Sequence, residues 1–283
     1  MTPTRNEHRR DAGFSLAELM VTLTILIVVL GVVFFALQRS QRQTARLTSV
    51  AEERQMARTA IQLLEREARM AGSGWGRTLI NGNAFTLHAI NPHYGGVPKS
   101  DSLVLVGAWQ ANTTTTSLMS TSSGSIIVTS PTGFKTNDLI LVTDKDGRTA
   151  DLFQVTGIAG STLSHANTSS YNDNGGRTGF PAGGYPIGSY VYKVTMATYY
   201  YDSTTYHKPA LMRSEVGQTA QIVAYNVNGF HVWYQLQDGT WTRNPTDLSL
   251  IDEVVPSVLT RVTDPRLPTL TDSVWAAVRP RTF

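Results

Sequence analysis

The longest apolar segment of the chain, residues 14–37, limits its possible folds more than any other feature. Sixteen of these 24 residues are Leu, Ile, Val or Phe, and Glu18 is the only charged residue among them. As one helix the segment is about 36 Å long, which is enough to cross a hydrocarbon core of about 30 Å. Its apolar side chains favour membrane insertion by about 5–10 kcal/mol, whereas one buried carboxylate costs about 2.5–3.5 kcal/mol. The segment is therefore predicted to enter a membrane, and Glu18 needs a reason to be there.

The residues before this segment do not form an ordinary signal peptide. The small pair Ala12-Gly13 precedes the apolar run, whereas a signal-peptidase site follows it. Three arginines precede the segment and three follow it: Arg5, Arg9, Arg10, Arg39, Arg42 and Arg46. This balance leaves the orientation undefined by the positive-inside rule. An uncleaved anchor, with Glu18 snorkelling to the interface, is one interpretation.

The run GFSLAELMVTLTIL, residues 13–26, resembles the amino-terminal motif of type IV prepilins and type II secretion pseudopilins. That motif has Gly before the cleaved bond, an aromatic first mature residue and Glu at the fifth mature position. The resemblance implies that prepilin peptidase cleaves between Gly13 and Phe14 and methylates the new amine of Phe14. It also implies that Glu18 of one subunit meets the Phe14 amine of a neighbour. Such a pair would join two charges in apolar surroundings and set the registry of a filament.

Helical signals continue well beyond the membrane-length segment. No Pro occurs between Thr4 and Asn91, and Gly31 is the only Gly in residues 14–71, so one continuous helix is predicted there. A stripe at three-four spacing is predicted to be buried: Leu47, Val50, Ala57, Ile61, Leu64, Ala68 and Ala71, with Leu63 and Met70 beside it. The opposite surface is predicted to be exposed and charged: Arg39, Arg42, Arg46, Glu52, Glu53, Arg58, Glu65, Arg66, Glu67 and Arg69.

Three closely spaced glycines, Gly72, Gly74 and Gly76, are predicted to end this helix, because glycine readily takes positive φ. The preceding run ARTAIQLLEREARMAGSG, residues 57–74, resembles the end of the long helix in PilW-type minor pilins. Residues 133–165 resemble a β-rich segment of the heads of such proteins.

Residues 77–283 alternate between runs of β-branched and aromatic residues and glycine-containing turns. Asp146-Gly147 and Asp238-Gly239 are hairpin signals. Residues 113–123 and 172–188 are rich in Ser, Thr, Gly or Pro and are predicted to be exposed loops. The fold class is therefore α+β and pilin-like, with a long amino-terminal helix packed on a mainly antiparallel head. The predicted segments are a leader at 1–13, a transmembrane part at 14–37, an amphipathic periplasmic part at 38–71 and a β-rich head at 72–283.

Composition and motifs exclude several classes of function. The 283 residues include no cysteine, which excludes disulfides, thiolate catalysis and most structural zinc sites. Their formal net charge is +3. No block of five like charges occurs, so no nucleic-acid partner is predicted. No metalloprotease, nucleophile-elbow or Walker motif is present, and neither a cofactor nor a metal is predicted.

Other polar clusters have simpler explanations than chemistry. Asp144, Asp146 and Asp151 resemble a calcium loop in part, but a hairpin turn explains them better. The tyrosine cluster at 199–201 and 206 is better explained by packing than by sugar binding. The histidines after residue 80 are isolated from one another in the sequence: His88, His93, His165, His207 and His231.

Together, these residues and resemblances indicate a non-enzymatic minor pilin of the PilW type. It would reside in a bacterial inner membrane with a periplasmic head and then join a pilus. Its implied partners are prepilin peptidase, other minor and major pilins and the assembly platform. The alternatives are a type II secretion pseudopilin and a membrane-anchored binding or adhesive protein that uses residues 113–123 or 172–188. A tethered enzyme is the third alternative, which a spatial cluster of His207 or His231 with acidic residues would favour.

Overall fold

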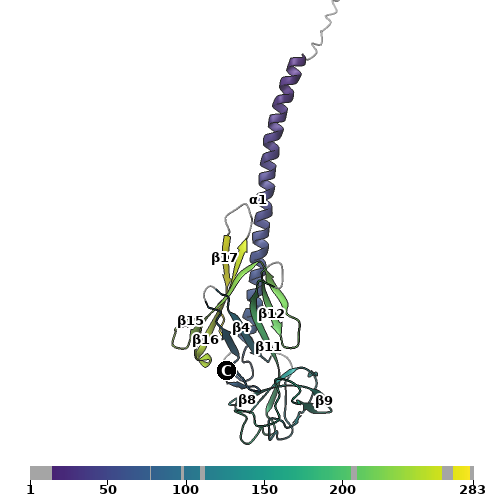
Figure 1. Ribbon diagram of the computed structural model, residues 1–283, viewed down its shortest axis with the longest axis vertical. Coiled ribbons are helices and arrows are strands. Elements are labelled where there is room, and N and C mark those ends of the chain that lie inside the picture. The colour runs from purple at the N-terminus through teal and green to yellow at the C-terminus, as the bar shows by residue number, and fades with distance from the viewer. Residues whose placement is uncertain are drawn as a thin grey trace, which may run out of the picture. The chain divides into compact units, whose positions relative to one another are not determined.

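The structure is a computed structural model that describes residues 15–76, 78–96, 99–108, 112–204, 209–262 and 270–280 (Figure 1). The chain forms two compact units, residues 1–51 and residues 52–283. Gly13 and Phe14, predicted to form the cleaved bond, lie outside the described residues, as do Tyr206 and His207.

Helix α1 spans Leu16–Met70, which confirms the long helix predicted from the absence of Pro. Its amino-terminal part is an apolar run, in which every residue from 16 to 37 is exposed. The helix ends where the glycines were predicted to end it. Gly72 and Gly76 have φ of 76° and 68°, and the Gly76 amide donates to the Gly72 carbonyl at 2.7 Å.

The largest sheet of the second unit is mainly antiparallel. Its strands are β1 (Ile80–Asn81), β2 (Thr86–Leu87), β3 (Ile90–His93), β4 (Ser102–Gly107), β5 (Asn112–Thr114), β7 (Leu139–Thr143), β8 (Ala150–Gln154), β11 (Tyr190–Asp202), β12 (Ala210–Glu215) and β13 (Gln221–Tyr225). They follow the order β13-β12-β11-β7-β8-β1-β2, while β4 and β5 also pair with β11 and β3 pairs with β4. The β1–β8 pair is parallel. The long strand β11 thus joins two smaller groups of strands into one sheet.

Two smaller sheets complete the head. The first has the order β6-β10-β9 and contains β6 (Ile126–Ile127), β9 (Gly157–Ala159) and β10 (Thr162–Ser164). The second has the order β15-β14-β16-β17 and contains β14 (Val227–Leu236), β15 (Trp241–Thr242), β16 (Ile251–Val262) and β17 (Leu270–Trp275). A 3-10 turn, Leu248–Leu250, precedes β16. Both predicted hairpins are present, with Gly147 between β7 and β8 and Gly239 between β14 and β15, each at positive φ.

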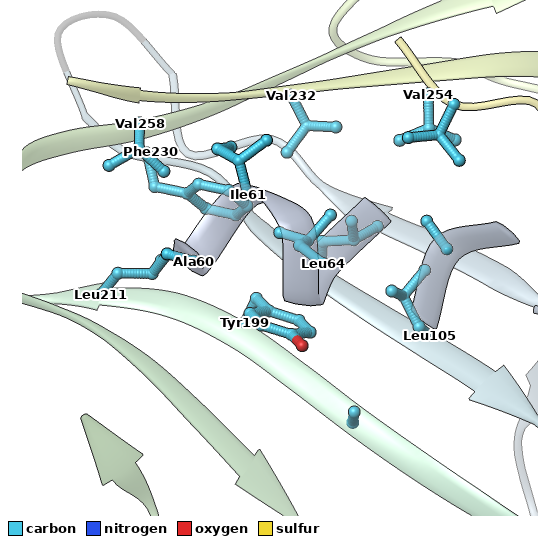
Figure 2. Close-up of a cluster of buried hydrophobic side chains, with 14 of the residues drawn as sticks. Ala60, Ile61, Leu64, Leu105, Tyr199, Leu211, Phe230, Val232, Val254 and Val258 are labelled. Atoms are coloured by element: carbon cyan, nitrogen blue, oxygen red, sulfur yellow. The ribbon is translucent and has the colours of Figure 1, made fainter. Parts of the chain in front are cut away.

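One hydrophobic core surrounds the carboxy-terminal part of α1. Figure 2 shows that part between strands of the large sheet and strands of the four-stranded sheet. The core includes Ala57, Ala60, Ile61, Leu64 and Ala68 of the helix. Leu64 is completely buried. Because both sides of this helical segment are covered, it serves as the central element of the head.

Two further cores lie on opposite faces of β7. Ile140 and Val142 belong to one core, and Leu139 and Leu141 belong to the other. Successive side chains of a strand point to opposite faces, so a strand with both faces covered is apolar at every position. This accounts for the run LILV, in which all four residues are buried.

Part of the predicted stripe is wrong. Leu47 is 63% exposed in the first unit and Val50 is only partly buried. Glu53 and Glu67, which were predicted to lie on the charged surface, are each only 8% exposed. Their carboxylates have hydrogen-bond partners in the head, which offsets the cost of burial. Helical periodicity did not reveal these partners because they come from distant strands.

The two predicted loops are also partly wrong. In 113–123, residue Thr115 bridges to Val128, and Thr115 and Met119 are only 2% and 1% exposed. In 172–188, Tyr185 is completely buried. The Ser- and Thr-rich run forms strand β5 and isolated bridges because its backbone pairs with residues far away in the chain. Further along the chain, Asn226, which has φ of 57°, separates strands β13 and β14.

Candidate functional site

The start of α1 is closed by two reciprocal hydrogen bonds between Ser15 and Glu18. The Glu18 backbone N–H donates to Ser15 Oγ at 3.2 Å, and the Ser15 backbone N–H donates to Glu18 Oε2 at 3.2 Å. This is a capping box, which satisfies backbone donors that a helix start leaves unpaired. The carboxylate also lies where the helix dipole favours negative charge. The S-x-x-E pattern at 15–18 was visible in the sequence, but the helix-capping role of Glu18 was not predicted from it.

The capping box places the Glu18 carboxylate next to the residue that follows Phe14. Cleavage before Phe14 would create a cationic amine one residue away from Ser15. The carboxylate would then have two candidate cationic partners, the amine of its own chain and the amine of a neighbouring subunit. Among the described residues, the structure itself shows only the contacts of Glu18 with Ser15.

The surface around this start is apolar for several turns. An 18-residue window of α1 has a mean hydropathy of 2.9 and no buried residue, so the helix is long and apolar enough to cross a membrane. The hydroxyls of Thr22 and Thr24 donate to Glu18 O and Met20 O at 2.9 and 3.0 Å, four residues earlier. Because these polar groups are satisfied within the helix, the surface can enter lipid or pack on another apolar helix.

In the head, Glu67 anchors α1 to the large sheet. Arg213 donates from Nη2 to Glu67 Oε1 at 2.6 Å and from Nε to Glu67 Oε2 at 3.2 Å. The Tyr199 hydroxyl donates to Glu67 Oε2 at 2.7 Å, and burial raises the pKa of Tyr199 well above its usual value. The bidentate ion pair is largely buried, and together with the Tyr199 hydroxyl it links α1, β11 and β12. It therefore sets the position of the helix on the sheet.

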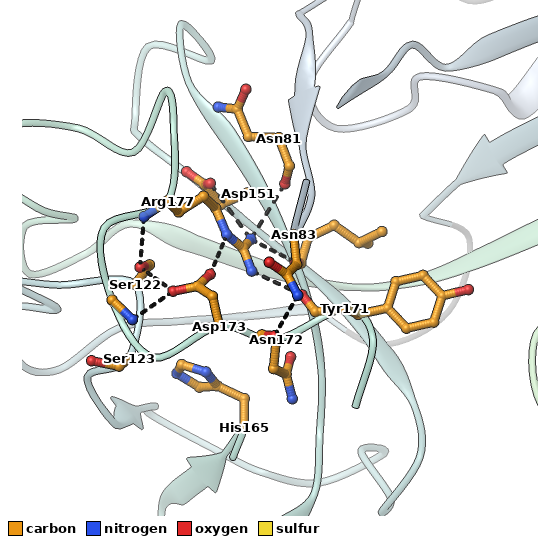
Figure 3. Close-up of polar contacts among 12 residues, drawn as sticks. Asn81, Asn83, Ser122, Ser123, Asp151, His165, Tyr171, Asn172, Asp173 and Arg177 are labelled. Carbon is orange, nitrogen blue, oxygen red and sulfur yellow. Dashed lines mark hydrogen bonds and ion pairs between the residues drawn. The ribbon is translucent and has the colours of Figure 1, made fainter. Parts of the chain in front are cut away.

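A second buried cation, Arg177, organises the other end of the head (Figure 3). Its side chain is 1% exposed and forms ion pairs with Asp173 at 2.7 Å and with Asp151 at 3.6 Å. The guanidinium also donates to the carbonyls of Leu152 and Tyr171 at 2.7 and 2.8 Å. This network ties residues 171–177 to strand β8, which explains why part of the predicted loop is ordered and buried.

Asp151 within this network has an unusual environment. Burial raises its pKa to about 6, although the hydroxyl of Tyr185 donates to it at 2.5 Å and Arg177 lies nearby. Asp144, by contrast, accepts from the backbone N–H groups of Arg148 and Thr149 and closes the β7–β8 hairpin. Asp144 and Asp151 thus have different partners, and the antiparallel pairing of β7 with β8 confirms the predicted hairpin.

The geometry around His231 does not resemble a catalytic base. Its Nδ1 lies 2.6 Å from Arg243 Nη2, so Nδ1 accepts and the proton is assigned to Nε2. Asp101 Oδ2 is 3.8 Å from Nδ1 and is bound by Arg243 at 3.0 Å. Burial and the adjacent Arg243 lower the pKa of His231. Within the described ranges, no group of three His, Asp or Glu residues is arranged to hold a metal ion.

Comparison with known proteins identifies the amino-terminal segment alone. A family model described as the prokaryotic N-terminal methylation motif matches residues 8–34, which include Gly13, Phe14 and Glu18. No curated protein and no solved structure matches the chain. The motif and the apolar helix support a membrane-anchored substrate of prepilin peptidase of the type IV pilin or pseudopilin type.

Proposed function

We propose that this chain is a minor pilin of the PilW type that takes part in the assembly of a type IV pilus. One observation carries the proposal. The methylation motif coincides with the start of an unbroken helix whose apolar side chains are all exposed from residue 16 to residue 37. A surface of this size needs an apolar environment, which a membrane supplies before assembly and neighbouring helices supply in a filament.

In this proposal, prepilin peptidase cleaves between Gly13 and Phe14 on the cytoplasmic side and methylates the Phe14 amine. The head lies in the periplasm, and α1 holds the subunit in the inner membrane. One face of the helix packs on a different face of the next subunit, an interface that does not close and so grows as a helical filament. The Phe14 amine of a neighbour pairs with Glu18 and sets the registry, because a shifted subunit would leave both charges unpaired.

The test separates the charge of Glu18 from its role in the capping box. Glu18→Gln keeps an N3 side chain that can accept from Ser15, but it removes the charge. Ser15→Ala removes the hydroxyl that accepts from the backbone N–H of residue 18 and keeps the charge. Glu18→Ala removes the charge and the acceptor of the Ser15 N–H, but it leaves the Ser15 hydroxyl in place. Each variant is expressed as the full chain, and its presence is measured in membranes and in sheared pili by immunoblot.

We expect all three variants in membranes, and we expect Glu18→Gln and Glu18→Ala to be absent from pili while Ser15→Ala remains. Normal incorporation of Glu18→Gln would show that the charge is dispensable.

Mass spectrometry provides an independent check of processing. The wild-type chain should begin at a methylated Phe14, and Gly13→Val should keep residues 1–13. Loss of protein secretion, with pili intact, in a strain lacking the chain would assign it to a type II secretion pseudopilus and refute the pilus proposal.

A further inference from the structure

The four-stranded sheet exposes three tryptophans on one face. Along β14, Phe230, Val232 and Tyr234 are at most 1% exposed and face the core. The intervening Trp233 therefore points to the opposite face of the sheet, and it is 45% exposed. Trp241 of β15 and Trp275 of β17 are 48% and 64% exposed.

The strand register places all three indoles on this outer face. Trp241 is directly opposite Gln235 of β14, two residues from Trp233. Ser257 of β16 is opposite both His231 of β14 and Trp275 of β17. Residues opposite each other share a face, so Trp241, Trp233 and Trp275 follow one diagonal across the sheet. From ordinary strand spacing, their successive Cα separations are about 8 Å and about 12 Å.

Neutral polar groups lie between these rings. The side chains of Gln235 and Ser257 make no hydrogen bond to any residue that the structure describes. His231 uses Nδ1 to accept from Arg243, which leaves its Nε2–H as a donor. The outer face therefore offers amide, hydroxyl and imidazole groups next to the exposed indoles.

Two ion pairs compensate charges near these rings. Arg243 is paired with Asp101 at 3.0 Å, and Arg279 lies 3.7 Å from Glu253. These pairs leave no uncompensated charge that a charged ligand could bind. Val255, which is opposite Trp233, adds an apolar side chain to this face. Gln235, His231 and Ser257 interrupt the apolar surface, unlike the continuous apolar centre of a typical protein–protein interface.

We propose that this face binds an extended, uncharged polysaccharide chain through Trp241, Trp233 and Trp275. One face of a pyranose ring presents C–H groups that can stack on the negative face of an indole, and its hydroxyls can bond to neutral side chains between the indoles. A row of separated rings suits a ligand that repeats along its length. This inference goes beyond filament assembly and does not depend on it, because each residue that carries it belongs to the head.

The test uses the full chain in detergent micelles on native gels that contain hydroxyethylcellulose, with binding to colloidal chitin as a second probe. We expect the wild-type chain to be retarded by at least one of these neutral polysaccharides. Trp233→Ala and Trp275→Ala should each weaken the binding about tenfold, the size expected for removal of a central contact. Trp275→Phe should keep most of the binding because it retains an aromatic face.

Tyr225→Ala is the matched control, since Tyr225 is an aromatic residue that is 43% exposed on the different strand β13. It should bind as the wild type does, and thermal unfolding followed by circular dichroism should show that all variants are folded. Absence of binding to both probes, or binding unchanged in the tryptophan variants, would overturn the proposal. The proposal would also fail if those variants kept polysaccharide binding but lost binding to pilin subunits or to lipid vesicles.

Discussion

The two ends of helix α1 have opposite relationships to the rest of the chain. Leu26, in the amino-terminal part, is 54% exposed, whereas Leu64, in the carboxy-terminal part, is completely buried. Both parts are rich in apolar residues, but only residues 52–70 belong to the unit that contains the sheets. One helix can therefore carry two kinds of apolar surface. One is used to fold the head, and the other is available to a membrane or another subunit.

Two glutamates of the helix, Glu67 and Glu18, show the same difference. Glu67 finds Arg213 and Tyr199 inside the head. Glu18 is exposed and bonds to Ser15, with no cationic partner in the part of the chain that the structure describes. Glu67 therefore contributes to the fold of one chain, whereas Glu18 is free to contribute to contacts between chains.

The largest effect that would test this difference is expected from Leu64→Ala. Removing a fully buried leucine side chain between two sheets should lower the free energy of unfolding of the head by about 4 kcal/mol. Thermal or urea unfolding of the full chain in detergent measures this loss. Leu26→Ala is the matched control, and it should leave the head transition unchanged. A similar loss in the two variants would show that the two parts of the helix are not distinct.

Glu67→Ala is expected to have the next largest effect. It leaves the buried guanidinium of Arg213 with Glu215 as its remaining carboxylate partner, so the head should lose about 3 kcal/mol of stability. The double variant Glu67→Leu/Arg213→Met should recover much of this loss, because it removes both charges and keeps apolar volume. Urea unfolding of the single and double variants measures the coupling. If the double variant were no more stable than Glu67→Ala, the cost would not arise from the unpaired cation.

The sequence predicted those features that depend on nearby residues. The absence of Pro predicted the long helix, and Gly72, Gly147 and Gly239 marked its end and two hairpins. Helical spacing was not enough to predict the burial of Glu67, because its partner Arg213 lies 146 residues further along the chain. The cleavage motif was recognisable because it is contiguous.

The tryptophan face was not predictable in the same way. Trp233, Trp241 and Trp275 come together only through the pairing of β14, β15, β16 and β17, which includes irregular register near Leu236. A shift of one residue in any of these pairs would send a tryptophan to the other face. Such a register depends on the whole sheet, and no local motif encodes it.

A smaller effect is expected from Asp151, a carboxylate whose environment lies wholly within the head. Its pKa in the folded head is raised to about 6 from 3.8, so protonation favours the folded state. This contribution is complete below the unfolded pKa and is lost as the pH rises through the folded pKa. Between about pH 4.5 and about pH 6.5 the wild type should lose about 2 kcal/mol relative to Asp151→Asn, which does not titrate.

Unfolding of both proteins across this pH range measures the difference, and the pH profile matters more than the absolute stability of either protein. Parallel profiles would mean that Asp151 ionises normally in the folded head. Replacing Glu18 with Gln should leave the unfolding free energy of the head unchanged, because Glu18 is exposed and belongs to the other unit. This result would separate the charges that stabilise the head from the charge for which a role in assembly is proposed.

The smallest effect on stability is expected at Leu47, where the stripe predicted from sequence and the structure disagree. The stripe predicted Leu47 to be buried, yet it is 63% exposed in the unit that contains residues 1–51. Leu47→Ala should therefore change the unfolding free energy by less than about 0.5 kcal/mol. If the stripe continues as a contact between subunits, the same variant should be depleted from sheared pili while its level in membranes is unchanged. Ser49→Ala is the control, because Ser49 is also exposed but lies about 200° away around the helix. Equal recovery of both variants in pili would mean that the apolar stripe ends at the head, so that only the membrane-length part of α1 is available to other subunits.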